Sequence, residues 1–490
     1  MTDAAEIRKV PAPAGALRHS FLRAALTAGR AVIGRRFSEL ARGMEEAQWL
    51  PAADLEVRSA ERLRSLLEHT AATVPFYRER GIGLSGSPME TLRRFPIMSK
   101  TEYRERGIEA FCSDRIPAFR RIDRTTSGST GEPFGFALDR SALPVIFASH
   151  LFYDSWFGLH PFDRYVRIMS PPAAVPTLPS STPLLFRMRQ AATRRLQLLY
   201  ESWTQEKIMV WEVSADTAES VYRRMERFKP DYVLGYTSSL AVIADELMKR
   251  GLRLSRPIRA VVTIAETLTA ARRKLIEAYF APEHIVNRYG MREFGSWSAQ
   301  NCTHSPDQFH INTELVVAEV LREDGSPAAP GEIGRVVLTD LWNYARPFVR
   351  YFTGDLAAAG PREPCACGRG FPMLGQIEGR SHECLYTPSG KVISPAVLGH
   401  YLFVYNNHLD SVRHYQLVQD GDDSVRLLVI PSNRWTDGTA AVLAEAIDKL
   451  VGGEMRVTVE PVPEIPAERS GKRPIIKSQG PRPRSARPKH

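Results

Sequence analysis

The chain of 490 residues has 43% apolar and 24% charged side chains, an ordinary balance for a soluble globular protein of two or three domains. Its net charge of +10 is concentrated at one end. Eight lysines or arginines and no acidic residue lie from Arg469 onward, which leaves about +2 for the rest of the chain. This excludes a broad nucleic-acid-binding surface, and no nucleic-acid partner is expected.

Five cysteines in a chain of this length exclude a disulfide scaffold. No stretch reaches the ~18 apolar residues that a membrane-spanning helix needs. Arg23 and Arg30 interrupt the apolar positions near the N-terminus, so no signal-peptide core is expected. These features predict a cytoplasmic protein without a transmembrane segment, and whether it forms a homodimer is left open.

Residues 1–59 are predicted to hold a disordered start rich in Ala and Pro, followed by an amphipathic helix. The helix is indicated by apolar residues at spacings of three, four and seven, which are Leu22, Leu26, Ile33, Phe37, Leu40 and Met44. The arginines between them suit a membrane surface, but packing on the protein's own domain is favoured. A second helix is expected at about Ala60–Thr70.

A loop rich in glycine and hydroxyl side chains runs from Thr125 to Pro133. Glycines let the backbone approach a ligand, and hydroxyls donate to phosphate oxygens without burying a charge. The loop therefore predicts a polyphosphate site made by Thr126, Ser127, Gly128, Ser129, Thr130 and Gly131. It lacks the Gly-Lys-Ser/Thr ending of a P-loop, so a P-loop NTPase is not expected. A Ser/Gly linker is the alternative, but linkers rarely sit between apolar runs.

Strand-like and helix-like segments alternate from Tyr165 to Asn287, which predicts a mostly parallel sheet covered by helices. The expected strands are Tyr165–Met169, Tyr232–Gly235, Ala260–Ile264 and Ile285–Asn287. The expected helices are Thr217–Phe228, Ser239–Arg250 and Thr269–Phe280, preceded by an aromatic-rich helix at Ala142–Gly158. Ser238 is predicted to cap one helix and Gly251 to end it.

From Leu315 the pattern changes to strands joined by turns, at Leu315–Leu321, Gly334–Thr339 and Phe348–Phe352. A second change in composition follows Gly379-Arg380. The expected fold class is therefore α/β. We expect a large N-terminal domain over 60–380, a small α+β C-terminal domain over 381–478, and a basic disordered tail over 479–490.

Acidic residues stand at three predicted strand ends, where open α/β sheets bind ligands. The stretches are Val261-Val-Thr-Ile-Ala-Glu266, Asn287-Arg-Tyr-Gly-Met-Arg-Glu293 and Arg350-Tyr-Phe-Thr-Gly-Asp355. Gly379-Arg380 and Ser470-Gly471-Lys472 follow. With the glycine-hydroxyl loop, these motifs in this order resemble the adenylate-forming superfamily, and within it the phenylacetate–CoA ligase and CapK-like branch. The resemblance includes Phe95-Pro-Ile-Met-Ser-Lys100 and covers roughly Glu61 to Lys477.

The resemblance implies mixed parallel sheets in the large domain, a mobile small domain, and an enzyme that activates a carboxylic acid with Mg-ATP. An acyl-adenylate forms first, and the acyl group then passes to the thiol of coenzyme A. The implied ATP-binding residues are those of the loop together with Ala265, Glu266, Tyr289, Gly290, Met291, Asp355 and Arg380.

Several single roles are also implied by the resemblance. Tyr289 would stack on adenine, Asp355 would accept the ribose hydroxyls, and Glu293 would be catalytic by holding Mg²⁺. Lys472 would be the catalytic cation between the carboxylate and the α-phosphate, with Lys477 as its rival. Glu132 departs from the pattern, because many relatives have lysine at that place.

The acid is expected to be aromatic or arylacetic, because the resemblance places the acyl pocket among Tyr153, Trp156 and Tyr236. The expected partners are thus a small carboxylic acid and CoA. A carrier-protein thiol or an amine is the alternative acceptor, as in relatives of specialised-metabolite or polysaccharide biosynthesis. A non-catalytic relative is the third interpretation, and only Glu132 and the basic tail support it.

Cys365-Ala-Cys367-Gly368 is a tight thiolate pair of the kind that holds zinc. Cys302 and His310 precede the strands that lead to it, and some relatives have a similar Cys…His and Cys-x-Cys arrangement with structural Zn²⁺. His304 is the competing fourth ligand, and reduced cysteines without a metal are the alternative. Four protein ligands leave no open position, so such a zinc would be structural.

Overall fold

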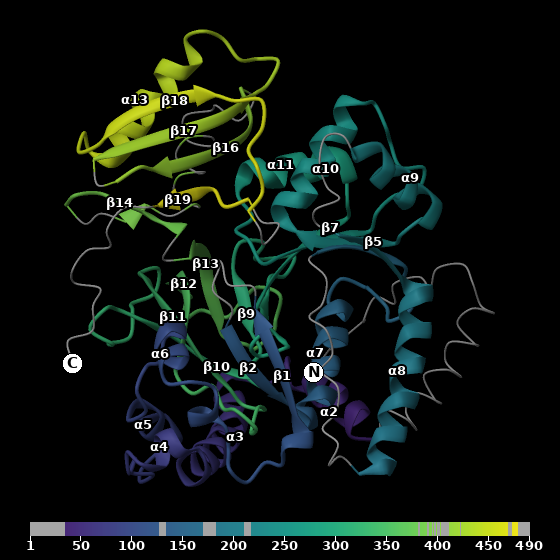
Figure 1. Cartoon of the computed structure of the whole chain (residues 1–490), viewed down its shortest axis with the longest axis vertical. Coiled ribbons are helices and arrows are strands. Elements are labelled where there is room, and N and C mark those ends of the chain that lie inside the picture. The colour runs from purple at the N-terminus through teal and green to yellow at the C-terminus, as the bar shows by residue number, and fades with distance from the viewer. Residues whose placement is uncertain are drawn as a thin grey trace, which may run out of the picture.

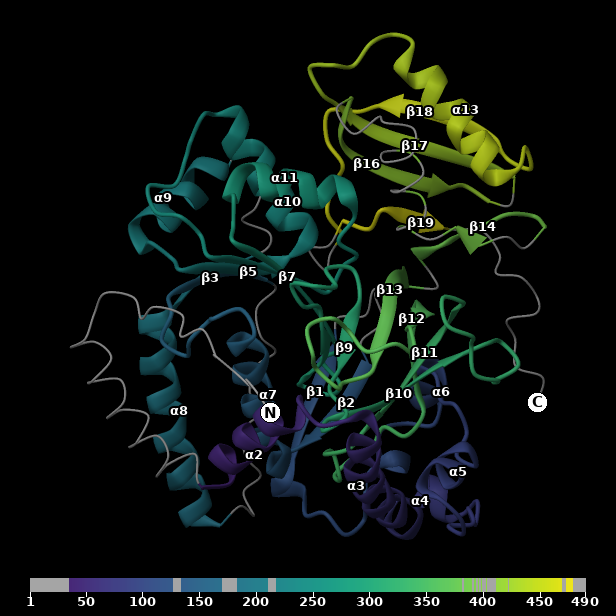
Figure 2. The same ribbon diagram turned by 180° about the vertical axis from the view of Figure 1, so that it is seen from behind.

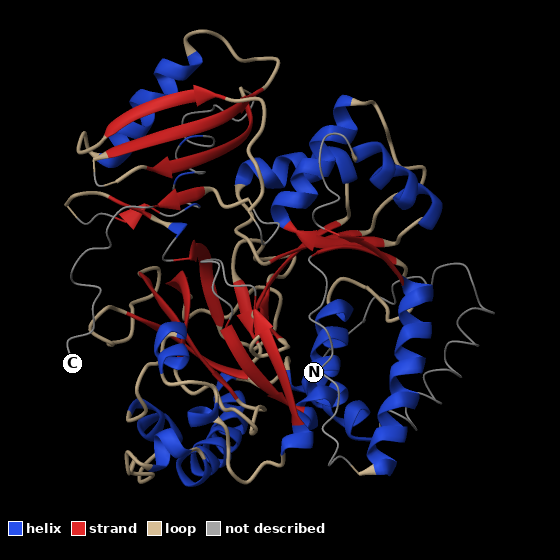
Figure 3. Cartoon of the chain, viewed as in Figure 1, coloured by secondary structure: helices blue, strands red, loops and turns tan. Residues whose placement is uncertain are grey.

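A large domain and a smaller one stacked against it make up the chain (Figures 1 and 3). The computed structural model describes residues 35–126, 134–169, 183–209, 217–380, 383–389, 392–393, 395, 398, 402, 411–421, 423–468 and 473–478.

Within the described residues, one mixed sheet of eleven strands organises the large domain, in the order β10-β11-β12-β13-β9-β8-β7-β6-β5-β3-β4. Neighbours from β4 to β7 are parallel, and every pair from β7 to β10 is antiparallel. The strands are β3 (Tyr165–Met169), β4 (Gln205–Met209), β5 (Tyr232–Tyr236), β6 (Ala260–Ile264), β7 (His284–Gly290), β8 (Trp297–Gln300), β9 (Phe309–Ile311), β10 (Val316–Leu321), β11 (Ile333–Asp340), β12 (Tyr351–Ala359) and β13 (Met373–Arg380). A separate hairpin pairs β1 (Arg121–Thr126) with β2 (Phe134–Asp139).

Helices cover both faces of the parallel half, with α9, α10 and α11 on one side and α7 and α8 on the other (Figures 1 and 2). The α-helices of the large domain are α2 (Arg35–Ala47), α3 (Ala52–Thr73), α4 (Pro75–Arg78), α5 (Pro88–Arg93), α6 (Lys100–Glu105), α7 (Leu143–Ser155), α8 (Leu184–Thr204), α9 (Ala218–Phe228), α10 (Thr237–Lys249) and α11 (Ala270–Phe280). None of these described helices is both long and apolar enough to cross a membrane.

The small domain has a sheet in the order β18-β17-β16-β19, with α13 packed on it. Its described elements are β14 (Leu385–Tyr386), β15 (Val392–Ile393), β16 (Val412–Gln419), β17 (Ser424–Pro431), α13 (Thr439–Val451), β18 (Arg456–Pro461) and β19 (Ile476–Ser478). Ala271 of α11 belongs to the apolar core of this domain, and His414 of β16 lies 3.2 Å from Asp245 of α10. The two domains therefore meet along α10 and α11.

The predicted fold class is confirmed, and the four predicted parallel strands are β3, β5, β6 and β7. Every residue of β5 and β6 is buried, as expected for strands covered on both faces. The amphipathic helix predicted near the N-terminus is present from Arg35 as α2, whose Met44 and Ala47 are buried in the main core. Packing on its own domain, the favoured prediction, is thus confirmed for this part of the helix.

Two local predictions are wrong. Ser238 does not cap α10, because that helix begins at Thr237 and the Ser238 N–H and Oγ donate to the Glu266 carboxylate at 2.7 and 3.0 Å. The strand predicted from Phe348 begins only at Tyr351, because Arg350 has a left-handed φ of 46°. No predicted element corresponds to α8 or β4.

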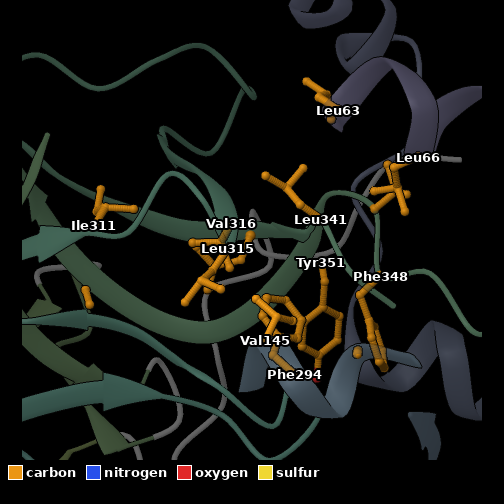
Figure 4. Packing of buried hydrophobic residues seen from close by; sticks show 14 of the residues in the cluster. Leu63, Leu66, Val145, Phe294, Ile311, Leu315, Val316, Leu341, Phe348 and Tyr351 are labelled. Atoms are coloured by element: carbon orange, nitrogen blue, oxygen red, sulfur yellow. The ribbon is translucent and has the colours of Figure 1, made fainter. Parts of the chain in front are cut away.

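The main core lies where α3 and α7 pack on the antiparallel half of the sheet. Figure 4 shows Leu63 and Leu66 of α3 above this half, with Val145 of α7 against Phe294 and Tyr351. The ring centroids of Phe348 and Tyr351 are 5.0 Å apart, and those of Phe294 and Phe348 are 5.8 Å apart. This aromatic packing fixes the backbone beside Glu293 and the start of β12.

Candidate active site

A hydrogen-bonded group joins the ends of β7 and β13 to the middle of β12, so the strand end predicted at Asp355 is wrong. The Tyr289 hydroxyl donates to Asp355 Oδ2 at 2.6 Å, and Arg380 Nε lies 3.8 Å from Asp355 Oδ1. Asp355 and Arg380 are direct partners in the β12–β13 register. Burial and the neighbouring Asp355 hold the pKa of Tyr289 well above its usual 10, so its hydroxyl stays a donor.

Glu293 forms a second group beside the first. Its side chain is 9% exposed, and its Oε1 lies 3.8 Å from Lys100 Nζ and 3.5 Å from the Tyr351 hydroxyl. The Lys100 ammonium also lies 5.0 Å from the ring centre of Phe134, the first described residue after the glycine-hydroxyl loop. Burial lowers the pKa of Lys100, and this outweighs the opposite effect of Glu293. The two groups thus bring two carboxylates and two cations together beside β7, β12 and β13.

Local structure explains the position of Lys100, which was not predicted as a site residue. Ser99 and Glu102 form a capping box that starts α6 at Lys100. Just before it, Met98 bridges to Tyr351, with its N–H donating to the Arg350 carbonyl at 3.0 Å. The capping pattern Ser99-x-x-Glu102, which begins inside the Phe95–Lys100 motif, was the sequence signal for this helix start. The contact with Tyr351 of β12 could not be predicted from it.

The end of β6 connects the site to the small domain. Ala265 has a left-handed φ of 64°, a conformation that is uncommon for a residue other than glycine. The Glu266 carboxylate accepts the Arg473 N–H at 3.2 Å, and Arg272 donates to the Arg473 carbonyl at 2.6 Å. A Cβ on Gly379 would lie 3.1 Å from Pro395 of the small domain and 3.4 Å from Thr267, so β13 also ends at this junction.

Gly290 is required by close packing at the end of β7. A Cβ there would lie 2.9 Å from the Ser296 carbonyl and 2.9 Å from the Trp297 ring. Met291, the next residue, packs partly buried against the main core. Gly290 therefore lets the end of β7 pack closely against Trp297 at the start of β8.

Two groups of predicted residues fall outside the described part of the chain. Thr126 ends β1, and Ser127, Gly128, Ser129, Thr130 and Gly131 follow it beyond the described residues. Lys472 is also outside them, next to Arg473, whose backbone is fixed on Glu266 and Arg272. The roles of these residues stay predictions.

The three residues predicted for an acyl pocket lie in two places. Tyr153 is fully buried, and its hydroxyl donates to the Ser298 and His310 carbonyls at 3.3 and 3.4 Å. Trp156 packs edge-on against Tyr153 and against the His310 ring. Tyr236 instead ends β5, directly before Thr237, which donates to the Glu266 carbonyl at 3.1 Å. Of the three, Tyr236 is the one that the structure brings to the strand ends.

Cys302, His310, Cys365 and Cys367 form one cluster, with their ligand atoms all within 4.8 Å of one another. The sulfurs of Cys302 and Cys365 are 3.6 Å apart, close to the ~3.8 Å that a tetrahedral metal bound about 2.3 Å from each sulfur would impose. His310 Nδ1 lies 3.3 Å from the Phe371 carbonyl, which leaves Nε2 facing Cys367 at 3.4 Å. The competing His304 is exposed and lies outside this cluster.

The protonation of the cluster fits a metal site. Burial, aided by Cys367, raises the pKa of the Cys302 thiol to about 12. Burial lowers the pKa of His310 to about 4, so its Nε2 is available as a ligand at neutral pH. The donor set of three sulfurs and one imidazole suits zinc.

Known proteins are similar to this chain in sequence and in fold. The chain is 25% identical to a phenylacetate–coenzyme A ligase of Thermus thermophilus over 87% of its own length and 97% of that protein. It is 24% identical to protein CapK of Staphylococcus aureus over 46% of this chain and 47% of that one. Residues 385–479 match the family described as CapK C-terminal domain.

The fold is also that of a 2-hydroxyisobutyryl-CoA ligase solved in the postadenylation state with 2-HIB-AMP, with a TM-score of 0.71, 19% identity, and 89% and 92% of the two chains covered. Against the same ligase in its thioesterification state the TM-score is 0.56, with equal coverage. These similarities in sequence and fold support an adenylate-forming enzyme of the phenylacetate–CoA ligase and CapK branch.

We predict that Tyr289→Phe lowers the free energy of unfolding by about 1–3 kcal/mol, because it removes the donor to a partly buried carboxylate. Urea denaturation measures this change. The control is Tyr222→Phe, which removes an exposed hydroxyl bonded to the Arg253 carbonyl and should change stability by less than about 0.5 kcal/mol. Equal effects of the two variants would contradict a special role for the Tyr289–Asp355 bond.

Proposed function

We propose that this chain activates an aromatic or arylacetic acid with ATP as an acyl-adenylate and transfers the acyl group to coenzyme A. One observation carries the proposal. Glu293, Asp355, Lys100 and Arg380 gather around the ends of β7 and β13 and the middle of β12, and the Lys100 ammonium lies over Phe134, where the glycine-hydroxyl loop ends. A site with both charge signs suits a reaction that joins a carboxylate to a phosphate.

Each charged group then has a role in the first step. Asp355 accepts hydrogen bonds from the ribose hydroxyls, and Tyr289 of β7 holds the Asp355 carboxylate in place. The loop hydroxyls donate to the phosphates. Glu293 would hold Mg²⁺, which would neutralise charge on the phosphate oxygens. The acid's carboxylate oxygen attacks the α-phosphorus, and pyrophosphate leaves with the electron pair of the broken P–O bond.

Lys100 supplies positive charge to the phosphates in this proposal. Glu132 stands where many relatives have lysine, so the loop itself brings no cation. Lys100 is half-buried, held between Glu293 and the Phe134 ring, and close enough to Arg380 for that cation to lower its pKa further. A desolvated ammonium interacts more strongly with an anion than one in water does.

The acid class rests on the Thermus thermophilus relative, named as a phenylacetate–coenzyme A ligase, and on Tyr236 at the end of β5. The small domain is the reason to consider a second kind of acceptor for the acyl group. Its match is to the CapK C-terminal domain, and this domain supplies the surface that changes between the two steps in such enzymes. A carrier-protein thiol or an amine is thus the alternative to CoA.

The deciding experiment is acid-dependent exchange of pyrophosphate into ATP across a panel of aromatic, arylacetic and aliphatic acids. Exchange driven by one aromatic class supports the proposal, and exchange driven by aliphatic acids alone contradicts the acid class. The same reaction with CoA, a phosphopantetheine carrier or an amine then identifies the acceptor. No exchange with any acid would contradict the adenylation step.

Glu293→Gln should abolish acid-dependent pyrophosphate exchange while the protein remains folded, because a neutral amide binds Mg²⁺ poorly. Circular dichroism and exchange kinetics measure the two effects. The Glu319→Gln control removes a carboxylate of similar burial from the pair with Arg350, and it should retain exchange. Near-normal exchange by folded Glu293→Gln would end this assignment.

Lys100→Met should reduce exchange by about 100-fold or more without lowering the midpoint of thermal unfolding. Burial already disfavours the charged form of Lys100, so a neutral side chain costs the fold little. Lys207→Met is the matched control, because Lys207 is 35% exposed against 34% for Lys100 and is also paired with a glutamate. A loss of stability that accounts for the loss of exchange would leave Lys100 with a structural role only.

Lys472→Ala should cut adenylate formation by orders of magnitude and largely spare acyl transfer from a supplied acyl-adenylate. The reason is that a cation between the carboxylate and the α-phosphate is needed only in the first step. Lys477→Ala is the control, since Lys477 lies in β19, paired with Val418 of β16. If Lys477→Ala gave this difference between the two steps, the role would move to Lys477, and an equal loss in both steps would contradict domain rotation.

We also propose a structural Zn²⁺ held by Cys302, His310, Cys365 and Cys367. Elemental analysis should find about one zinc per chain, and Cys365→Ser should lose it and unfold at lower temperature. Cys384→Ser is the control, because Cys384 is a buried free cysteine outside the cluster. Metal-free protein with unchanged thermal stability would contradict the zinc.

A further inference from the structure

Helix α8 leaves large apolar side chains in solvent along most of its length. Leu185 is 82% exposed and Trp203 is 62% exposed, and Leu184, Met188, Leu198 and Leu199 are each more than half exposed. Single exposed apolar residues are normal on a protein surface, but this many on one helix mark an interaction surface. We call these six residues the α8 apolar face.

The spacing of these residues places most of them on one side of the helix. Leu185, Met188, Leu199 and Trp203 are separated by 3, 11 and 4 residues, which at 3.6 residues per turn keeps them within about 60° of one another. The stretch from Leu185 to Trp203 is about 27 Å long. It is long enough to cover an extended, flat partner.

Arginines accompany the α8 apolar face. Arg187, Arg194 and Arg195 are exposed, and no acidic residue occurs from Leu184 through Tyr200. The first acid, Glu201, is paired with Lys207 of β4 at 2.5 Å. At 3.6 residues per turn Arg187 and Arg194 lie opposite the α8 apolar face and Arg195 lies at its edge. The helix is therefore apolar on one side and cationic on the other, as helices at an anionic lipid surface are.

The helix lies at the edge of the molecule, where an extended surface can reach it. Figures 1 and 2 show α8 as the outermost helix on its side, with its length running along the large domain. Its C-terminal end is attached to the body, because the Tyr200 hydroxyl donates to the Pro161 carbonyl and the Tyr200 ring packs on Phe162. This attachment holds the helix in place while the α8 apolar face stays open.

We propose that α8 binds the protein to the surface of an anionic lipid bilayer, lying in the plane of the headgroups. Apolar side chains enter the acyl boundary, arginines contact phosphate groups, and Trp203 takes the interfacial position that tryptophan prefers. The arginines prevent the helix from spanning the bilayer, in agreement with the failure of every described helix to qualify as a span.

Charge argues against a second copy of this chain as the partner. Arg195 lies next to the midpoint of α8, so antiparallel pairing of two α8 helices about a two-fold axis would bring Arg195 onto its own copy. No acid on this stretch of the helix would neutralise the pair. A lipid surface supplies the missing negative charge throughout.

Vesicle flotation of the full chain tests the proposal, with phosphatidylcholine vesicles and vesicles that also contain phosphatidylglycerol. The wild type should float with the anionic vesicles at least about tenfold more than with neutral ones, and less so in high salt. The triple variant Leu185→Ser, Leu199→Ser and Trp203→Ser should lose at least about tenfold of this binding, although it keeps every basic residue of the C-terminal tail.

The control variant Val57→Ser, Leu84→Ser and Val442→Ser removes exposed apolar side chains elsewhere and should bind as the wild type does. Binding by the triple α8 variant equal to wild type would overturn the proposal by assigning binding to the tail. A wild type that ignores both vesicles, or a dimer that the α8 variant dissociates, would also overturn it. Circular dichroism and pyrophosphate exchange of the α8 variant confirm that it is folded, independently of lipid binding.

Discussion

The hydrogen bond from Tyr289 to Asp355 connects the two halves of the sheet on which the site depends. Tyr289 ends the last parallel strand, β7, whereas Asp355 lies in β12, which is surrounded by antiparallel neighbours. A buried hydroxyl that donates to a carboxylate costs little, but a carboxylate without a donor there would be strongly destabilising. The bond therefore fixes the distance between the end of β7 and the middle of β12, and with it the position of Arg380 at the end of β13.

The second constraint is that charges of both signs share a partly buried space. Lys100 and Glu293 are brought together by a capping box on one side and by the Phe294, Phe348 and Tyr351 rings on the other. Burial in this arrangement lowers the pKa of Lys100. Groups with shifted pKa values cluster at functional sites. The burial that disfavours the ammonium is the same burial that strengthens its attraction to a bound anion.

The small domain is attached to the large domain close to this site. Arg473, adjacent to Lys472, is bound through its backbone to Glu266 and Arg272, and Pro395 lies against Gly379. The arrangement is more similar to the postadenylation structure of the 2-hydroxyisobutyryl-CoA ligase than to its thioesterification structure. Hydrogen bonds make part of this junction, and Ala271 of α11 adds an apolar contact with the core of the small domain.

The sequence by itself determined the parallel strands, the order of the motifs and the residue types of the metal cluster, because these depend on local periodicity and spacing. Its choice of His310 over His304 rested on the resemblance, since both are near Cys302 and only β9 turns His310 toward Cys367. It could not pair Ser238 with Glu266 or Lys100 with Glu293, because these partners are far apart in sequence. It also left α8 without a role, since exposure is a property of the packed molecule. Only tertiary structure decides which side chains meet across the sheet and which face solvent.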